Sequence, residues 1–275
     1  MVACLKPYRR MSTGYVQLRD GYTAEYIDAG EGEPVVLVPG LAGGLALLEP
    51  LIQELSGHFR VLAYQLRGEE RGLFERRFGF RQLVQDLDEV ICQFALERPG
   101  LIGASFGGAI ALDFATRNSH RLSFLAVQGS SYRYAPGLFG DVARRVLDRL
   151  PLPFDNPFVN QFFSVLIGGR RKEGDRFDFI VDRCWQTDQS VMAQRFAMLE
   201  EYDIRDQVRS LRVPTLVLNG ERDIMVPTRE AKSFADQVPH GRYEEIAAAG
   251  HLAFVTHVPE LSRRIQVFGQ SSLSV

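Results

Sequence analysis

At residues 103–108 the sequence reads Gly-Ala-Ser-Phe-Gly-Gly, directly after a short apolar strand at Leu101-Ile102 and before a helical pattern. A G-x-S-x-G sequence between a strand and a helix is typical of a nucleophile elbow. The turn is so sharp that positions two residues before and after the serine have almost no room for side chains, which suits Gly103 and Gly107. Backbone N–H groups at the helix start favour developing negative charge. Ser105 is therefore a predicted nucleophile, although the motif alone also fits a tight turn that happens to contain serine.

Apolar runs alternate with helical patterns on both sides of this turn. Residues 35–38, 124–127 and 215–218 are continuous apolar runs, typical of strands buried on both faces. Apolar residues at helical spacing follow the first strands, at 45–55 and 83–94. Strands that alternate with helices require crossover connections, so the sequence predicts an α/β fold with a mainly parallel sheet.

The alternation stops between about residues 132 and 206. This stretch contains four prolines, eight phenylalanines and one tryptophan, and no clear buried-strand run. Short helices separated by prolines are the simplest interpretation. We expect residues 132–206 to form a helical cap over the carboxyl edge of the sheet, inserted into a core made of residues 1–131 and 207–275.

A serine needs a base to become a good nucleophile, and the chain has five histidines. His251 follows Ala249-Gly250, after the last predicted strand and before the last helix, which places it at the carboxyl edge of the sheet with the serine turn. His257 is the competitor. It lacks a preceding glycine and lies close to the final helix, so we expect a surface or capping role for it.

The imidazole in turn needs a carboxylate that fixes its tautomer and stabilises its protonated form. Asp223 lies in a loop just past the strand at 215–218, also at the carboxyl edge, and Glu221 is its nearest rival. Taken alone, Asp223 is better explained as a turn residue or a helix cap. The order Ser105, Asp223, His251, each after a different strand, is the order in which α/β-hydrolases carry their triad.

From about residue 15 to residue 268 the chain resembles the α/β-hydrolase superfamily, and within it the small capped esterases and C–C hydrolases. The resemblance implies a mostly parallel eight-stranded sheet flanked by helices, with a helical cap. It also implies an oxyanion hole made of the backbone N–H groups of Leu41 and Phe106. The sequence departs from the family at Pro39, where a histidine is common, and at Gln65, where an aspartate is usual. The main-chain donors remain, but a side chain that often organises the loop is missing at position 39. The hydrogen bonds with which the family's aspartate anchors the loop are not implied for Gln65.

The composition excludes several other classes of protein. Basic and acidic residues number 32 and 34, which gives a net charge of −2 and no basis for a polyanion-binding surface. The three cysteines, at positions 4, 92 and 184, have neither metal-ligand nor disulfide-framework spacing. No apolar run is long enough for a transmembrane helix. We expect a cytoplasmic protein with a small-molecule substrate and without nucleic-acid partner, membrane association, metal or other cofactor; the oligomeric state stays open.

These features together predict a serine hydrolase, a carboxylic-ester hydrolase first of all, that forms an acyl-enzyme on Ser105. The cap is rich in aromatics, so we expect a small, mainly apolar acyl substrate, with a pocket that includes Phe158, Phe162, Phe163 and Trp185. A C–C bond hydrolase or a perhydrolase would use the same triad. A ligand receptor on a hydrolase fold, with little turnover, could retain it too.

Overall fold

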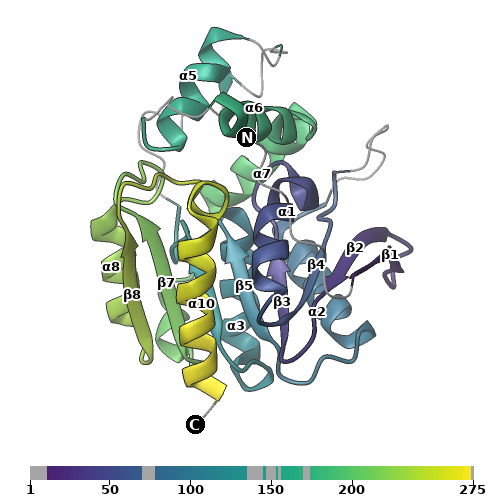
Figure 1. Ribbon diagram of the computed structural model, residues 1–275. Coiled ribbons are helices and arrows are strands. Elements are labelled where there is room, and N and C mark those ends of the chain that lie inside the picture. The colour runs from purple at the N-terminus through teal and green to yellow at the C-terminus, as the bar shows by residue number, and fades with distance from the viewer. Residues whose placement is uncertain are drawn as a thin grey trace.

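A single sheet of eight strands forms the centre of the molecule (Figure 1). The computed structural model describes residues 11–69, 78–134, 145–146, 153, 156–169 and 174–273. The strands are β1 (Met11–Gln17), β2 (Thr23–Ala29), β3 (Pro34–Val38), β4 (Arg60–Tyr64), β5 (Gly100–Ala104), β6 (Leu125–Gln128), β7 (Thr215–Gly220) and β8 (Gly241–Ile246). They lie in the order β1-β2-β4-β3-β5-β6-β7-β8.

The strands from β4 to β8 run parallel, which confirms the predicted mostly parallel sheet. Every residue of β5, β6 and β7 is buried, as expected where helices cover both faces of a sheet. The predicted hairpin forms the antiparallel edge, with β1 paired to β2 and β2 to β4. Its turn closes through the Leu18 N–H, which donates to the Tyr22 carbonyl at 2.7 Å.

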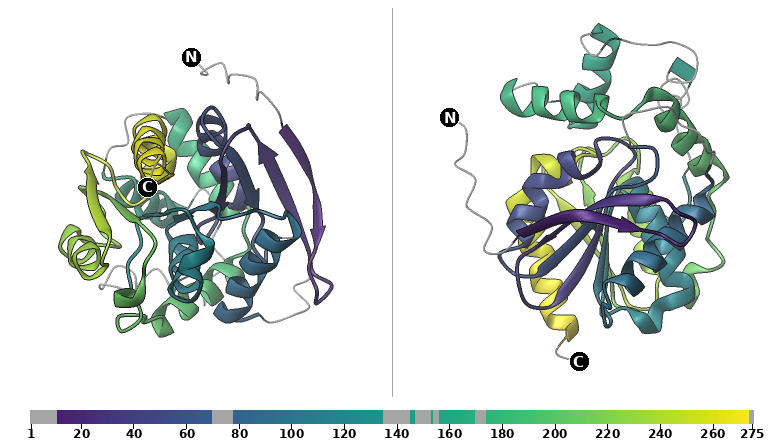
Figure 2. Two further views of the ribbon diagram at one scale, coloured as in Figure 1. Left: turned by 90° about the horizontal axis from the view of Figure 1, so that it is seen from below. Right: turned by 90° about the vertical axis from the view of Figure 1, so that its right-hand side faces the viewer.

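Helices cover both faces of the sheet, as Figure 2 shows from below. On one face lie α1 (Gly44–Leu55) and α10 (Val258–Leu273), and α1 packs against α10. On the other lie α2 (Phe80–Gln93), α3 (Phe106–Asn118) and α8 (Thr228–Gln237), whose apolar side chains share one buried cluster with alternate strand residues. The helix α3 carries mostly small residues toward the sheet, so its N-terminus can approach the ends of β3 and β5 closely.

Three described helices lie between β6 and β7, above the edge of the sheet where the parallel strands end (Figures 1 and 2). They are α5 (Pro157–Leu166), α6 (Gly174–Trp185) and α7 (Gln189–Glu201). The side chain of Asn156 accepts the Phe158 N–H at 2.8 Å and so caps α5, whose first residue is a proline. Of the residues on which the predicted cap rests, Pro136, Pro151 and Phe154 lie outside the described residues.

Entry to and exit from this helical segment lie side by side. The Ile204 N–H donates to the Tyr132 carbonyl at 2.8 Å, and Arg133 forms an isolated antiparallel bridge with Asp203. The chain therefore enters and leaves this helical segment through two adjacent, hydrogen-bonded stretches of backbone. In the part of the chain that the structure describes, no helix is both long and apolar enough to cross a bilayer.

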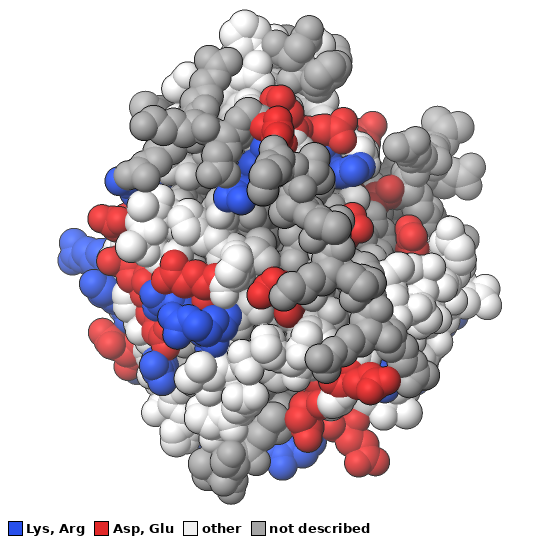
Figure 3. Space-filling model, viewed as in Figure 1, with Lys and Arg blue, Asp and Glu red and all other residues white. Residues whose placement is uncertain are grey.

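Acidic and basic side chains are mixed on the face drawn in Figure 3. The strand β8 and the helix α10 contribute ion pairs to this mixing, because Glu244 binds Arg242 at 2.7 Å and Arg264 at 2.9 Å. Arg242 is exposed, whereas Glu244 and Arg264 are half-buried, so the Arg242 pair contributes little to stability.

Candidate active site

Ser105 occupies a strained turn between β5 and α3, with φ of 51° and ψ of −116°. Added to Gly103, a Cβ atom would lie 2.5 Å from the Cα of Gly108. Added to Gly107, it would lie 2.3 Å from the carbonyl oxygens of both Val38 and Pro39. Neither position can hold a side chain without moving backbone, which is the physical reason for the glycines on either side of the serine.

His251 connects Ser105 to a carboxylate. The Ser105 hydroxyl donates to Nε2 of His251 at 2.7 Å. On the other side of the ring, Nδ1 lies 2.9 Å and 3.0 Å from the two carboxylate oxygens of Asp223. The carboxylate therefore favours the tautomer that carries its proton on Nδ1 and leaves Nε2 free to accept.

The Asp223 carboxylate is itself held by the loop after β7. Its Oδ1 accepts the N–H groups of Met225 at 2.8 Å and Val226 at 2.9 Å, and the side chain is fully buried. Hydrogen bonds of this kind fix the position of a buried carboxylate. The structure places the rival Glu221 elsewhere: its Oε2 accepts the Ala248 N–H at 2.7 Å.

Backbone contacts fix the loop that carries His251. The His251 N–H donates to the Leu166 carbonyl at the end of α5, at 2.7 Å, and the Gln128 side chain donates to the His251 carbonyl at 3.0 Å. Gly129 has φ of 62°, and a Cβ atom there would lie 3.1 Å from the imidazole. The other candidate base, His257, ends the short helix α9 (Ala253–Thr256), and its Nδ1 lies 2.9 Å from the Thr256 hydroxyl.

The loop at residues 39–44 passes directly over the serine turn. A Cβ atom on Gly40 would lie 3.4 Å from the Ala104 carbonyl and 3.8 Å from the Cβ of Ser105. Leu41 and Phe106, whose N–H groups are the predicted oxyanion donors, line the same cavity as Ser105. The unusual Gln65 anchors the far end of this loop, since its Oε1 accepts the Leu45 N–H at 2.8 Å.

An apolar cavity of about 110 Å³ opens above Ser105 and His251. The four aromatic residues singled out from the sequence, Phe158, Phe162, Phe163 and Trp185, all lie on its wall. Phe163 meets Phe162 and Trp185 edge to face, with ring centroids 5.7 Å and 6.1 Å apart. Phe158 is 40% exposed, so it belongs to the outer part of the wall.

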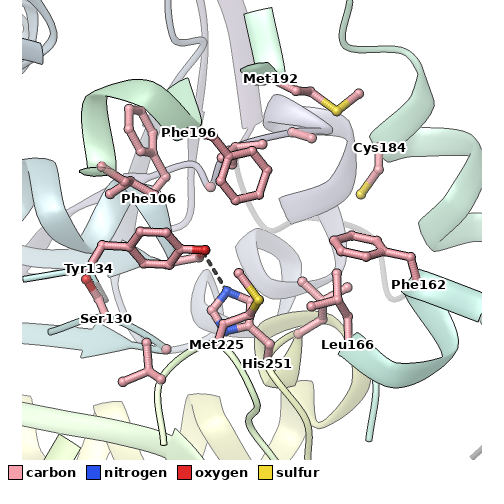
Figure 4. A pocket seen from close by; sticks show the side chains of 18 of the residues that line it. Phe106, Ser130, Tyr134, Phe162, Leu166, Cys184, Met192, Phe196, Met225 and His251 are labelled. Atoms are coloured by element: carbon pink, nitrogen blue, oxygen red, sulfur yellow. Dashed lines mark hydrogen bonds between the residues drawn. The ribbon is translucent and has the colours of Figure 1, made fainter. Parts of the chain in front are cut away.

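Several wall residues were not expected from the sequence. Figure 4 shows Met225 beside His251, and Phe196 and Met192 farther up the wall of the same cavity. Met192 and Phe196 lie one helical turn apart on α7, so their spacing could have identified them as one face of that helix. Met225 stands two residues after Asp223, and the position of the acid loop would have placed it near the site.

Arg133 is the one arginine on the described wall of the cavity. Its Nε lies 3.6 Å from the Glu230 carboxylate, and burial raises the pKa of that carboxyl. Cys184 also lines the cavity, and burial raises the pKa of its thiol far above the ordinary value, which keeps it protonated and unreactive. Among the described residues, no cluster of three or more histidine, cysteine or acidic side chains could hold a metal ion.

Comparison with known proteins gives a consistent pattern. Residues 33–258 match the family model described as "alpha/beta hydrolase fold". The pimeloyl-[acyl-carrier protein] methyl ester esterase of Vibrio cholerae is 26% identical over 249 residues, which cover 87% of this chain and 95% of that protein. The 2-hydroxy-6-oxo-2,4-heptadienoate hydrolase of Pseudomonas putida is 28% identical over 262 residues, or 86% of this chain and 89% of that protein. The enol-lactonase of Burkholderia xenovorans LB400 superposes with a TM-score of 0.82 at 20% identity, covering 93% of this chain and 99% of that structure.

Proposed function

This chain belongs to the alpha/beta hydrolase family, and we propose that it is a serine esterase with Ser105 as nucleophile, His251 as base and Asp223 as the acid of the triad. The observation that carries the proposal is the continuous hydrogen-bonded chain from the Ser105 hydroxyl through the imidazole to the Asp223 carboxylate, at 2.7 Å and 2.9 Å. This chain opens into a cavity whose wall is mainly apolar. Esterases and a C–C hydrolase among the relatives support a hydrolase.

The geometry allows a two-step acyl transfer. The Ser105 oxygen attacks the ester carbonyl carbon while its proton passes to Nε2 of His251. The Leu41 and Phe106 N–H groups stabilise the resulting oxyanion. Collapse of this intermediate expels the alcohol, which takes the proton from His251, and leaves the acyl group on Ser105. A water molecule then repeats the sequence and releases the carboxylic acid. The two steps need no metal or organic cofactor.

The substrate that fits best has a small, uncharged and mainly apolar acyl group. The cavity wall is formed mostly by aromatic, aliphatic and methionine side chains. Such a wall stabilises buried apolar groups by about 0.8 kcal/mol for each methylene. A charged acyl group would have to compete with Glu230 for Arg133, whose Nε lies 3.6 Å from that carboxylate.

We propose that residues 132–206 are the cap and that residues 1–131 and 207–275 are the core. The pairing of Tyr132 with Ile204 and of Arg133 with Asp203 supports these boundaries, since chain entry and exit lie together there. The aromatic wall of the cavity comes from α5, α6 and α7, so the cap would set the acyl specificity. A cytoplasmic location stays a prediction from the cysteine pattern.

Cleavage of a C–C bond is the second candidate, because a relative of 28% identity is named as a hydrolase of 2-hydroxy-6-oxo-2,4-heptadienoate. That compound is an anion and needs a cation in the site. Arg133, the one arginine on the described wall, is paired with Glu230. This pairing favours a neutral ester over an anionic dienoate.

Steady-state kinetics with p-nitrophenyl esters of two to eight acyl carbons, beside this dienoate and a panel of lactones, tests the proposal. We expect the highest kcat/KM for a short or medium acyl ester. Ser105→Ala is expected to fold and to lose activity by a factor on the order of 10³ or more. His251→Ala is expected to be inactive while its matched control, His257→Ala, keeps most of the activity. Near-normal turnover by Ser105→Ala, or the reverse result for the two histidines, would contradict the assignment.

A further inference from the structure

A buried arginine of the cap reaches the loop that passes over Ser105. Arg195 lies on α7 and its side chain is fully buried. One terminal nitrogen donates to the Leu41 carbonyl at 2.6 Å, and the other donates to the Arg67 carbonyl at 2.7 Å. The guanidinium also forms an ion pair with Glu69, whose side chain is 4% exposed.

A second hydrogen-bonded branch runs from the same carboxylate to the same loop. The Thr187 hydroxyl, just before α7, donates to Oε2 of Glu69 at 2.6 Å. The Thr187 oxygen in turn accepts the N–H of Gly43 at 2.8 Å. Glu69 therefore joins two cap residues that hold the loop at two points, the Leu41 carbonyl and the Gly43 N–H.

These two points lie next to each other in the loop, directly before its left-handed residues Gly43 and Gly44. Gly43 has φ of 81°, a left-handed conformation that a glycine adopts at little cost. Holding the carbonyl of Leu41 restricts the rotation of the residue whose N–H faces the oxyanion. Pro39 offers no hydrogen-bonding side chain at the start of this loop. The organising contacts come instead from Glu69, Thr187 and Arg195.

A buried ion pair is a costly way to hold a fold together, because desolvation of both charges offsets most of their attraction. The Arg195–Glu69 pair is better explained by the backbone groups that it holds in place than by a contribution to the free energy of unfolding. Arg195 connects the cap to two core segments, and each hydrogen bond given for it goes to a backbone carbonyl or to the carboxylate that binds Thr187.

We propose that Glu69, Thr187 and Arg195 are positioning residues for the oxyanion hole, acting through the loop that carries the Leu41 N–H. This proposal rests on the serine esterase function proposed above. It predicts that loss of the network weakens stabilisation of the transition state more than binding of the ester. The same contacts that dock the cap on the core would then also hold the oxyanion hole in its active geometry.

The decisive variants are Thr187→Val and Thr187→Ser. Valine has nearly the shape of threonine and removes both hydrogen bonds, whereas serine keeps the hydroxyl. We expect Thr187→Val to lower kcat by roughly 10- to 100-fold and to change KM by less than about threefold. The loss in kcat should be smaller than the factor on the order of 10² to 10³ that follows removal of a whole oxyanion donor. Thr187→Ser is expected to restore most of kcat. Arg195→Gln and Glu69→Gln leave a buried charge or dipole without its partner, so they are secondary variants read together with an unfolding curve.

A control is available in an ion pair outside this network. Arg60 binds the Asp28 carboxylate at 2.7 Å, where β4 pairs with β2. Asp28→Asn is expected to lower stability slightly but to leave kcat near the normal value. Inhibitors add a readout that a purely structural role would not change. A trifluoromethyl ketone forms an anionic tetrahedral adduct with the serine, so its Kd should rise in Thr187→Val by the same factor as kcat falls. The matching methyl ketone, which stays neutral, should bind all variants alike.

Three results would overturn the inference: normal kcat in Thr187→Val, a failure of Thr187→Ser to restore it, or equal weakening of both ketones. Each of these is distinct from failure of the proposed function, which would show instead as activity that survives Ser105→Ala.

Discussion

Gly250 stands directly before His251, and the end of helix α5 packs against it. A Cβ atom on this glycine would lie 2.3 Å from the Leu166 carbonyl oxygen and 2.4 Å from the Gly168 nitrogen. Both are backbone atoms, so no side chain can rotate away. Because carbon makes its best contacts at about 3.5 Å, the alanine variant must separate the two segments by about 1 Å.

This displacement would lengthen the hydrogen bond from the His251 N–H to the Leu166 carbonyl, which is 2.7 Å in the unsubstituted protein. The imidazole moves with the loop, away from the Ser105 hydroxyl. A misplacement of about 1 Å costs on the order of 10² in rate, and overpacking of the contact lowers stability by roughly 1–3 kcal/mol. We therefore expect Gly250→Ala to lose about 10²-fold in kcat/KM while it still folds.

The assay is hydrolysis of a p-nitrophenyl ester, with urea unfolding measured on the same preparations. Gly79→Ala is the matched control, since a Cβ atom there meets nothing within 4 Å and the φ of −111° suits alanine. It should behave as the unsubstituted protein in both measurements. Unchanged kcat/KM in Gly250→Ala would refute the idea that α5 holds the His251 loop in place.

Three further predictions concern other parts of the molecule. Burial raises the pKa of the Cys184 thiol, whereas Cys92 is exposed. Iodoacetamide should therefore alkylate Cys92 in the folded protein and Cys184 only after unfolding, as measured by peptide mass spectrometry. Rapid labelling of Cys184 in the native protein would contradict this. Burial raises the pKa of the Asp113 carboxyl, so the folded protein favours its protonated form. The free energy of unfolding is therefore unaffected by this group below its unfolded-state pKa of about 3.9, and it falls as pH rises through the higher folded-state pKa. Asp113→Asn should therefore gain free energy of unfolding relative to the unsubstituted protein between roughly pH 3.5 and pH 7, and a gain that is constant or falls with pH in urea titrations would argue against it. Phe162→Ala enlarges the cavity above Ser105, so the kcat/KM ratio of octanoate to butyrate ester should rise on the order of 10-fold. An unchanged ratio would show that Phe162 does not contact the acyl group.

The parts of the fold that follow from local pattern were predicted correctly. Continuous apolar runs identified β3, β6 and β7, and an Asp-Gly turn between two short strands identified the β1–β2 hairpin. Each of these elements is determined by neighbouring residues, because burial of a parallel strand on both faces demands apolar side chains throughout.

The candidate triad residues could be named from their positions after successive strands, and the structure brings all three within hydrogen-bonding distance. Contacts between distant segments had no such local signal. Arg195 and Glu69 are 126 positions apart, and each reads in the sequence as an ordinary surface charge. The bond between His251 and Leu166 uses backbone atoms, which no side-chain pattern reveals.

Mass spectrometry after treatment with a fluorophosphonate, which phosphonylates an activated serine, tests directly whether Ser105 is the nucleophile. We expect one adduct per chain, on the peptide that contains Ser105, formed at the same rate at which esterase activity disappears. Ser105→Ala should take up no adduct, and His251→Ala should react far more slowly, since its serine has lost the base. An adduct on another residue, or full esterase activity in a protein labelled at Ser105, would show that Ser105 is not the nucleophile.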